Sequence, residues 1–163
     1  MSFTSGQCLR KGCDKTEITR NIVRSIETVL RQDEDLFYNV IVTAYDSDTS
    51  AVPIDKGIIS VGLDGMYVGE KTPDEPSNVN SSSEHRDYTA RVIVKIHTPC
   101  EAGEAITYQL LDKVLSAVFK VEQSLGNTLS YISVKQPKYL RFTDSMRLDT
   151  ILGLKGKLSF SEE

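Results

Sequence analysis

The sequence predicts an α+β fold, in which a mainly antiparallel or mixed sheet carries two helices packed on one face. Three observations lead to this prediction. An apolar stripe with helical spacing runs through residues 18–30, and an alternating strand at 88–97 leads directly into a second amphipathic helix. The chain then closes with a long alternating segment at 147–160. Elements of these kinds pack as a layer of helices on a layer of sheet.

Length and charge limit the classes of protein that this chain can be. Its 163 residues, 39% of them hydrophobic, fit a flexible N-terminal arm over 1–15 and one domain over 16–163. Nonspecific nucleic-acid binding depends on clustered Lys and Arg, but the net charge is −4 and no basic block exceeds Arg10-Lys11. No apolar run approaches the ~18 residues that span a bilayer. We therefore expect neither direct nucleic-acid recognition nor a membrane partner.

The first helix is predicted over Thr16–Gln32. Asp14 and Glu17 have the spacing of a capping box, and one face of the segment is apolar. The helix should end near Gln32, because the three acids at 33–35 would oppose its dipole at the C-terminus. These acids are assigned to the connection that follows.

Three strands are predicted next, as a meander. Residues 38–45 are β-branched and aromatic enough for a strand. Residues 57–63 and 66–68 flank Asp64-Gly65, a dipeptide that favours a tight hairpin because Gly tolerates positive φ.

Residues 71–87 form a long polar run with a single aliphatic side chain. Such a segment buries too little apolar area to offset its ordering entropy, so we expect a long loop. It is either an interaction element or a tolerated surface insertion.

The second half of the chain alternates strand, helix and strands. The strand at 88–97 should bury one set of side chains, namely Tyr88, Ala90, Val92, Val94 and Ile96. A helix is predicted over 103–119, then a strand at 129–135 that continues at 139–142. In the final strand, Gly153 and Gly156 indicate a bulge or bend.

The candidate metal set consists of two ligand pairs, Cys8 with Cys13 and His97 with Cys100. Thiolates with one imidazole suit a structural, tetrahedral zinc site. The alternative is that these are unligated residues of a terminus and of a helix start. A Cys–His nucleophile at 97–100 lacks an orienting acid, and Glu101 and Glu104 would disfavour a thiolate. We therefore predict no catalytic residue, no enzyme activity and no cofactor.

A locally basic segment is the better candidate for function. It stands out within an acidic chain and contains tyrosine, which with arginine is favoured at interface hot spots. The candidate interaction residues are Lys135, Lys138, Tyr139, Arg141 and Arg147. The alternative is an ordinary solvated strand face. If the segment is an interface, Glu at 141 and 147 should leave the monomer folded and weaken its association.

This arrangement resembles the tail terminator proteins (tail-completion or collar proteins) of tailed bacteriophages and phage-tail-like particles. Three features carry the resemblance: the helix at 16–32 followed directly by a meander, the strand at 90–97 feeding the helix at 103–119, and the long final strand at 148–160. The paired cysteines at 8 and 13 are not part of it.

The resemblance implies a homohexameric ring that caps the tail tube and ends its polymerisation. The implied partners are further copies of the chain, the tail tube protein and, in contractile tails, the sheath. The implied location is the bacterial cytoplasm during assembly and then the virion or tail-like particle. The 71–87 loop would order against a neighbouring subunit or the tube. Alternatives are a head-to-tail connector or another adaptor module, and a zinc- or thiol-dependent enzyme.

Overall fold

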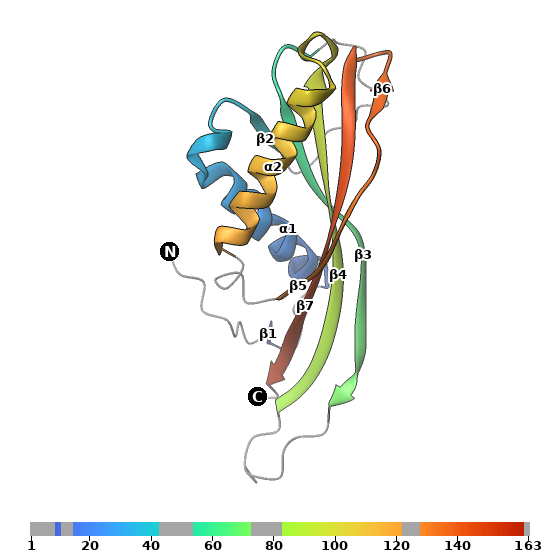
Figure 1. Ribbon diagram of the computed structural model, residues 1–163. Coiled ribbons are helices and arrows are strands. Elements are labelled where there is room, and N and C mark those ends of the chain that lie inside the picture. Colours follow the sequence, from blue (N-terminus) through green and yellow to red (C-terminus); the bar gives the residue numbers. More distant parts are fainter. Residues whose placement is uncertain (1–8, 11–14, 43–53, 73–82, 122–127, 162–163) are drawn as a thin grey trace.

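The structure is a computed structural model that describes residues 9–10, 15–42, 54–72, 83–121 and 128–161. Within these residues two α-helices, α1 (Lys15–Gln32) and α2 (Glu104–Val121), pack on a seven-stranded sheet (Figure 1). Two short 3-10 helices, η1 (Glu34–Leu36) and η2 (Cys100–Ala102), follow α1 and precede α2. The strands are β1 (Leu9–Arg10), β2 (Val40–Val42), β3 (Ile58–Thr72), β4 (Ser83–Pro99), β5 (Thr128–Val134), β6 (Lys138–Leu140) and β7 (Ser145–Ser161).

Two long strands, β4 and β7, form the centre of the sheet. They pair antiparallel along all 17 residues of each strand. The second edge of β7 is covered in succession by β6, β5 and β1, of which β1 is parallel to it. On the far side of β4 lies β3, antiparallel, and β2 pairs parallel with the start of β3. The sheet is thus mixed and mainly antiparallel.

Both helices cover the same face of the sheet, on the left in Figure 1. α1 packs against β2 and β3, α2 packs against β4 and β7, and the helices contact each other. The sheet residues beneath them alternate with outward-facing ones, as expected for a strand that is half buried. The five residues predicted to face inward on β4 are all buried: Tyr88, Ala90, Val92, Val94 and Ile96. The predicted fold class is confirmed.

The hairpin predicted at Asp64-Gly65 is wrong. β3 runs straight through this dipeptide, and the register against β4 shifts between Leu63 and Gly65, so Asp64 is the extra residue of a bulge. The Asp64 carboxylate lies 2.7 Å from the guanidinium of Arg91 on β4, which holds the bulge to its neighbour. Because β2 is parallel to β3, the predicted meander is wrong as well. The strand predicted over 38–45 begins later, since Tyr38 and Asn39 belong to the turn before β2, and residues 43–45 lie outside the described residues.

The polar loop predicted over 71–87 is shorter at both ends. Residues 71–72 end β3 and residues 83–87 begin β4, where they pair along β7. Strand pairing uses the backbone, so a polar side chain there is no obstacle. Residues 73–82 lie outside the described part of the chain. Of the predicted N-terminal arm, Leu9–Arg10 pair with the end of β7, whereas Asp14, Cys8 and Cys13 lie outside the described residues.

Of the bulge or bend predicted at Gly153 and Gly156, a bulge against β4 is wrong, because β7 keeps one register with β4 through both residues. The register of β7 with β5 does shift, between Leu129 and Tyr131, which pair with Leu154 and Gly153. The glycines instead make room for two tyrosine rings. A Cβ added at Gly153 would lie 2.2 Å from Cε1 of Tyr131, and one at Gly156 would lie 2.5 Å from the hydroxyl oxygen of Tyr88. Each glycine is therefore a site of close side-chain approach rather than a break.

Candidate functional site

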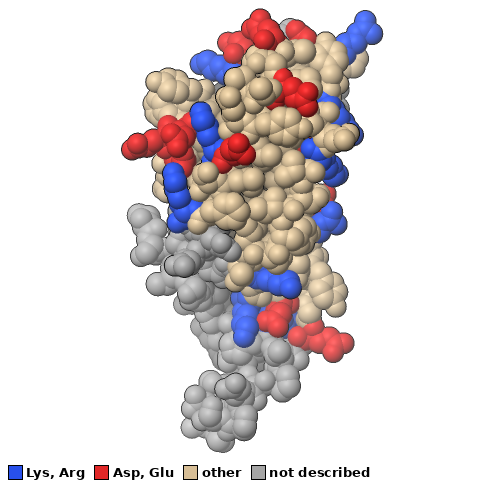
Figure 2. Space-filling view, in the orientation of Figure 1, with Lys and Arg blue, Asp and Glu red and all other residues tan. Residues whose placement is uncertain are grey.

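A basic edge borders the sheet where β5 leads into β6. We define it as Lys135, Lys138, Tyr139, Arg141 and Phe142, all of which are exposed. β6 pairs with the first residues of β7, and this pairing fixes the segment at the sheet margin. Tyr139 is 55% exposed and Phe142 69% exposed, so two aromatic rings lie at the surface of this edge. Figure 2 shows Lys and Arg side chains along the upper right side, where Figure 1 places β6.

Tyr139 is held in place although its ring is exposed. Its hydroxyl donates a hydrogen bond to Oδ1 of Asp144 at 3.0 Å, and this bond raises the pKa of Tyr139. The aromatic ring is thus presented to solvent in a fixed position. A fixed, exposed tyrosine loses little side-chain entropy on binding, which favours a role in an interface.

Arg147 differs from the other four predicted interaction residues. Its side chain is only 18% exposed, and its Nε and Nη2 atoms each lie 2.8 Å from a carboxylate oxygen of Asp149. Burial, the largest single influence, raises the pKa of Asp149, but the hydrogen bonds and charge of Arg147 outweigh it and leave that pKa below its usual value. Arg147 is therefore half-buried and held by an ion pair within β7, unlike the exposed residues of the basic edge.

His97 alternates with the five predicted inward-facing residues of β4, which would place it on the outer side of the strand, yet it is fully buried. It stands opposite Ile58 on β3 and Arg147 on β7. Burial and then the nearby Arg147 charge lower the pKa of His97 to about 4. The ring is therefore neutral at physiological pH.

Of the four candidate zinc ligands, the structure describes two, His97 and Cys100, and they form no metal site with other described residues. His97 is buried and Cys100 is half-buried at the start of η2. Among the described residues, no group of three or more His, Cys, Asp and Glu side chains could hold a metal ion. The other two candidate ligands, Cys8 and Cys13, lie outside the described residues.

An acidic corner follows α1, on the opposite side of the molecule from the basic edge. We define it as Glu34, Asp35, Phe37 and Tyr38, which are all exposed. Figure 2 shows acidic side chains standing out at the left, where Figure 1 places the segment after α1. Phe37 is 79% and Tyr38 85% exposed, and their rings meet edge to face with centroids 5.6 Å apart.

The neighbouring Asp33 has a different role. Its carboxylate accepts a hydrogen bond from the Asp35 backbone N–H at 3.0 Å, which caps η1. It also lies 3.4 Å from Nζ of Lys120 on α2. Glu34 and Asp35 have no ion-pair partner among the residues that the structure describes. Sequence reasoning assigned these acids to a connection and Tyr38 to a strand. The missed signal is the acidic run followed, after Leu36, by two aromatic residues.

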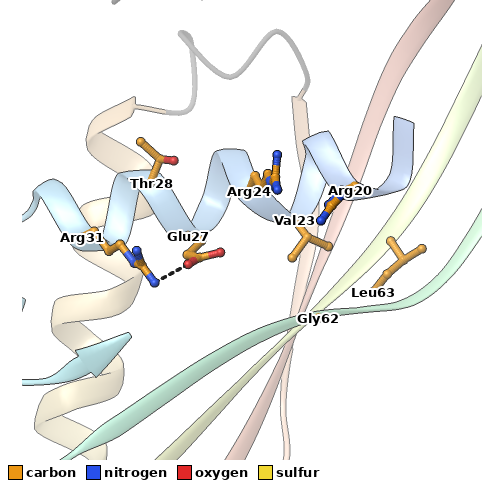
Figure 3. Close-up of a pocket in the computed structure, with 8 residues that line it drawn as sticks. All are labelled: Arg20, Val23, Arg24, Glu27, Thr28, Arg31, Gly62 and Leu63. Carbon is orange, nitrogen blue, oxygen red and sulfur yellow. Dashed lines mark ion pairs between the residues drawn. The ribbon is translucent and has the colours of Figure 1, made fainter. Parts of the chain in front are cut away.

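An open groove of about 660 Å³ lies between α1 and β3 (Figure 3). α1 crosses over the strand, and three arginines and one glutamate of the helix border the space. The lining residues are Arg20, Val23, Arg24, Glu27, Thr28, Arg31, Gly62 and Leu63. The sequence predicts one apolar face for this helix, but it does not predict which strand the charged residues face.

No protein-family model matches the chain, and no curated protein sequence matches it. Neither α-helix of the described residues is long and apolar enough to cross a membrane.

Proposed function

We propose that this chain is a structural assembly protein of a phage tail or tail-like particle, which forms a ring that caps the tail tube and ends its polymerisation. The observation that carries the proposal is the pair of unlike surfaces on opposite sides of one subunit. The basic edge and the acidic corner differ in charge, and each exposes two aromatic rings. The order of helices and long strands that resembles tail terminators adds to this support.

Two unlike, complementary surfaces favour head-to-tail association. In such an interface, the basic edge of one subunit meets the acidic corner of the next, and the same contact repeats around the assembly. Contacts of this type close into a ring when the rotation per subunit permits it. Exposed aromatic rings supply the contact area, and the opposite charges set the orientation of the two surfaces.

The proposed ring is a homohexamer whose partner is the tail tube protein and, in a contractile tail, the sheath. It would assemble in the bacterial cytoplasm and remain in the virion or tail-like particle. The proposal includes no catalytic step. A head-to-tail connector would also form a ring, so ring formation and tube capping need separate tests.

Two measurements test the proposal. The first is the mass of the purified chain by size-exclusion chromatography with light scattering, with negative-stain microscopy of the main peak. We expect a closed ring, and a strict monomer at high concentration would contradict it. The second is the length of tubes grown from the tube protein of the same genome. Added ring should shorten the tubes and be seen at their ends, whereas unchanged lengths with a ring present would favour a connector.

A further inference from the structure

The α1–β3 groove contains a free strand edge. β2 covers β3 only from Ile58 to Ser60, while β3 continues to Thr72. Beyond Ser60, the edge of β3 that faces away from β4 has no strand partner in the described part of the chain. Gly62 and Leu63, which follow Ser60 and Val61 on β3, line the groove. An edge of this kind presents backbone N–H and C=O groups that can pair with an added strand.

The charges of the groove are unequal. Arg31 lies 2.5 Å from the Glu27 carboxylate and donates a hydrogen bond to the Ile41 carbonyl at 2.8 Å. Glu27 is only 8% exposed, so this pair is largely neutralised within the protein. Arg20 and Arg24 are exposed, and they have no ion-pair partner among the described residues. The groove therefore presents two uncompensated positive charges next to a free strand edge.

Arg20 and Arg24 lie about one turn apart on α1, and both border the groove. Residues four apart on a helix are separated by about 6 Å along its axis. Alternate residues of a strand are separated by about 6.6 Å. Side chains at alternate positions of an added strand point the same way, so acidic residues at such positions would turn their carboxylates to one side.

We propose that the α1–β3 groove binds an extended acidic segment of a partner protein, which adds to the free edge of β3 as a strand. Backbone pairing to β3 beyond Ser60 supplies affinity, and Arg20 and Arg24 select acidic side chains at alternate positions. A nucleic acid fits less well, because its backbone cannot pair with a strand and the Glu27 carboxylate lies in the groove. No residue of the groove belongs to the basic edge or the acidic corner, so this inference does not rest on the proposed ring.

The test uses fluorescence anisotropy with the full chain and a labelled short peptide in which Val and Glu alternate. We expect saturable binding to the native chain. The Arg20→Glu/Arg24→Glu variant should bind the peptide at least about tenfold more weakly, which corresponds to a loss of ~1.4 kcal/mol in binding free energy. The matched control, Lys155→Glu/Lys157→Glu, changes the net charge equally at exposed positions of β7, which β4 separates from β3, and should bind normally. Circular dichroism checks folding, and Arg20→Gln/Arg24→Gln replaces the first variant if it does not fold.

Three further probes separate strand addition from simple charge attraction. A peptide of the same composition with its Val and Glu in separate blocks should bind more weakly, and so should an alternating peptide that is N-methylated at every second residue. Labelled oligothymidylate should bind more weakly than the alternating peptide. The proposal is overturned if the alternating peptide does not saturate at about 1 mM protein. It is also overturned if N-methylation has no effect, if both charge variants lose affinity equally, or if the oligonucleotide binds more tightly.

Discussion

The phenol ring of Tyr88 on β4 lies directly against Gly156, its cross-strand partner on β7. Tyr88 is 8% exposed and belongs to the hydrophobic core. The ring occupies the space that a side chain at Gly156 would need, since a Cβ there would lie 2.5–2.6 Å from three of its atoms. A glycine that would weaken an isolated strand here permits a large aromatic ring to be buried.

Gly156→Ala should therefore destabilise the protein. The added Cβ forces the Tyr88 ring out of its position, and overpacking of this kind costs about 1–3 kcal/mol. The free energy of unfolding from urea denaturation measures the effect. The matched control is Gly65→Ala on β3, because a Cβ at Gly65 meets no atom within 4 Å. Equal stabilities of the two variants would show that the ring does not fill the space over Gly156.

The burial of His97 predicts a loss of stability in mild acid. Its folded-state pKa of about 4 lies below its ordinary value of 6.5, so between these values the unfolded chain binds a proton that the folded chain does not. This contribution to stability is fully present above pH 6.5. It falls by about 1.4 kcal/mol per pH unit between pH 6.5 and 4, which is about 3 kcal/mol in all. The lowered pKa of Asp149 adds a further loss below its ordinary value of 3.8.

Urea denaturation at several pH values between 4 and 7 measures this dependence. His97→Gln should flatten the slope over that range, whatever it does to stability at neutral pH. The same substitution at His85, the other histidine of the sequence, should leave the slope from His97 in place. If the free energy of unfolding of His97→Gln depends on pH as steeply as that of the native protein, the pH dependence arises from other groups.

Arg147 and Arg141 should respond very differently to substitution. Arg147→Ala leaves the Asp149 carboxylate, whose side chain is 15% exposed, without its bidentate partner. We expect a loss of about 2–3 kcal/mol in the free energy of unfolding. Arg141→Ala removes an exposed charge and should change stability by about 0.5 kcal/mol or less. The Arg147→Ala/Asp149→Ala double variant should recover part of the loss, and failure to recover any would contradict the pairing.

Sequence patterns predicted the parts of the fold that local periodicity determines. Both helices and the inward face of β4 follow from apolar residues at 3.6- and 2-residue spacing. The errors arose where one residue type serves several structures. Gly65 fits a hairpin or a bulge, and Gly153 and Gly156 fit a bend or a close side-chain approach. Long-range partners decide between these structures. The partner is β4 for Gly65 and Gly156, and it is Tyr131 on β5 for Gly153.

The site was predicted less completely than the fold. The cluster of basic residues at 135–141 is visible in the sequence, and these residues are exposed in the structure. Arg147 was grouped with them, because the sequence does not show that Arg147 and Asp149 lie on a largely buried part of β7. The acidic corner and the α1–β3 groove depend on which surfaces remain exposed after the helices pack on the sheet. Residue patterns in the sequence do not show which surfaces these are.

Reversing the charge of either proposed ring surface should prevent assembly. Glu34→Lys/Asp35→Lys makes both surfaces basic, and Lys138→Glu/Arg141→Glu makes both acidic. Like charges across an interface repel, so each variant alone should remain monomeric. All four positions are exposed, so the folds should be retained. A chain that carries all four substitutions restores opposite charges and should assemble again.

The most direct test of the proposed ring is the light-scattering mass of an equimolar mixture of the two charge-reversed variants. In the mixture each basic surface can meet an acidic surface of the other variant, so the two should alternate around a ring with an even number of subunits. We predict that the mixture recovers the mass of the native assembly while each variant alone stays monomeric. A mixture that remains monomeric beside a native ring, or variants that assemble alone, would contradict the pairing of the basic edge with the acidic corner.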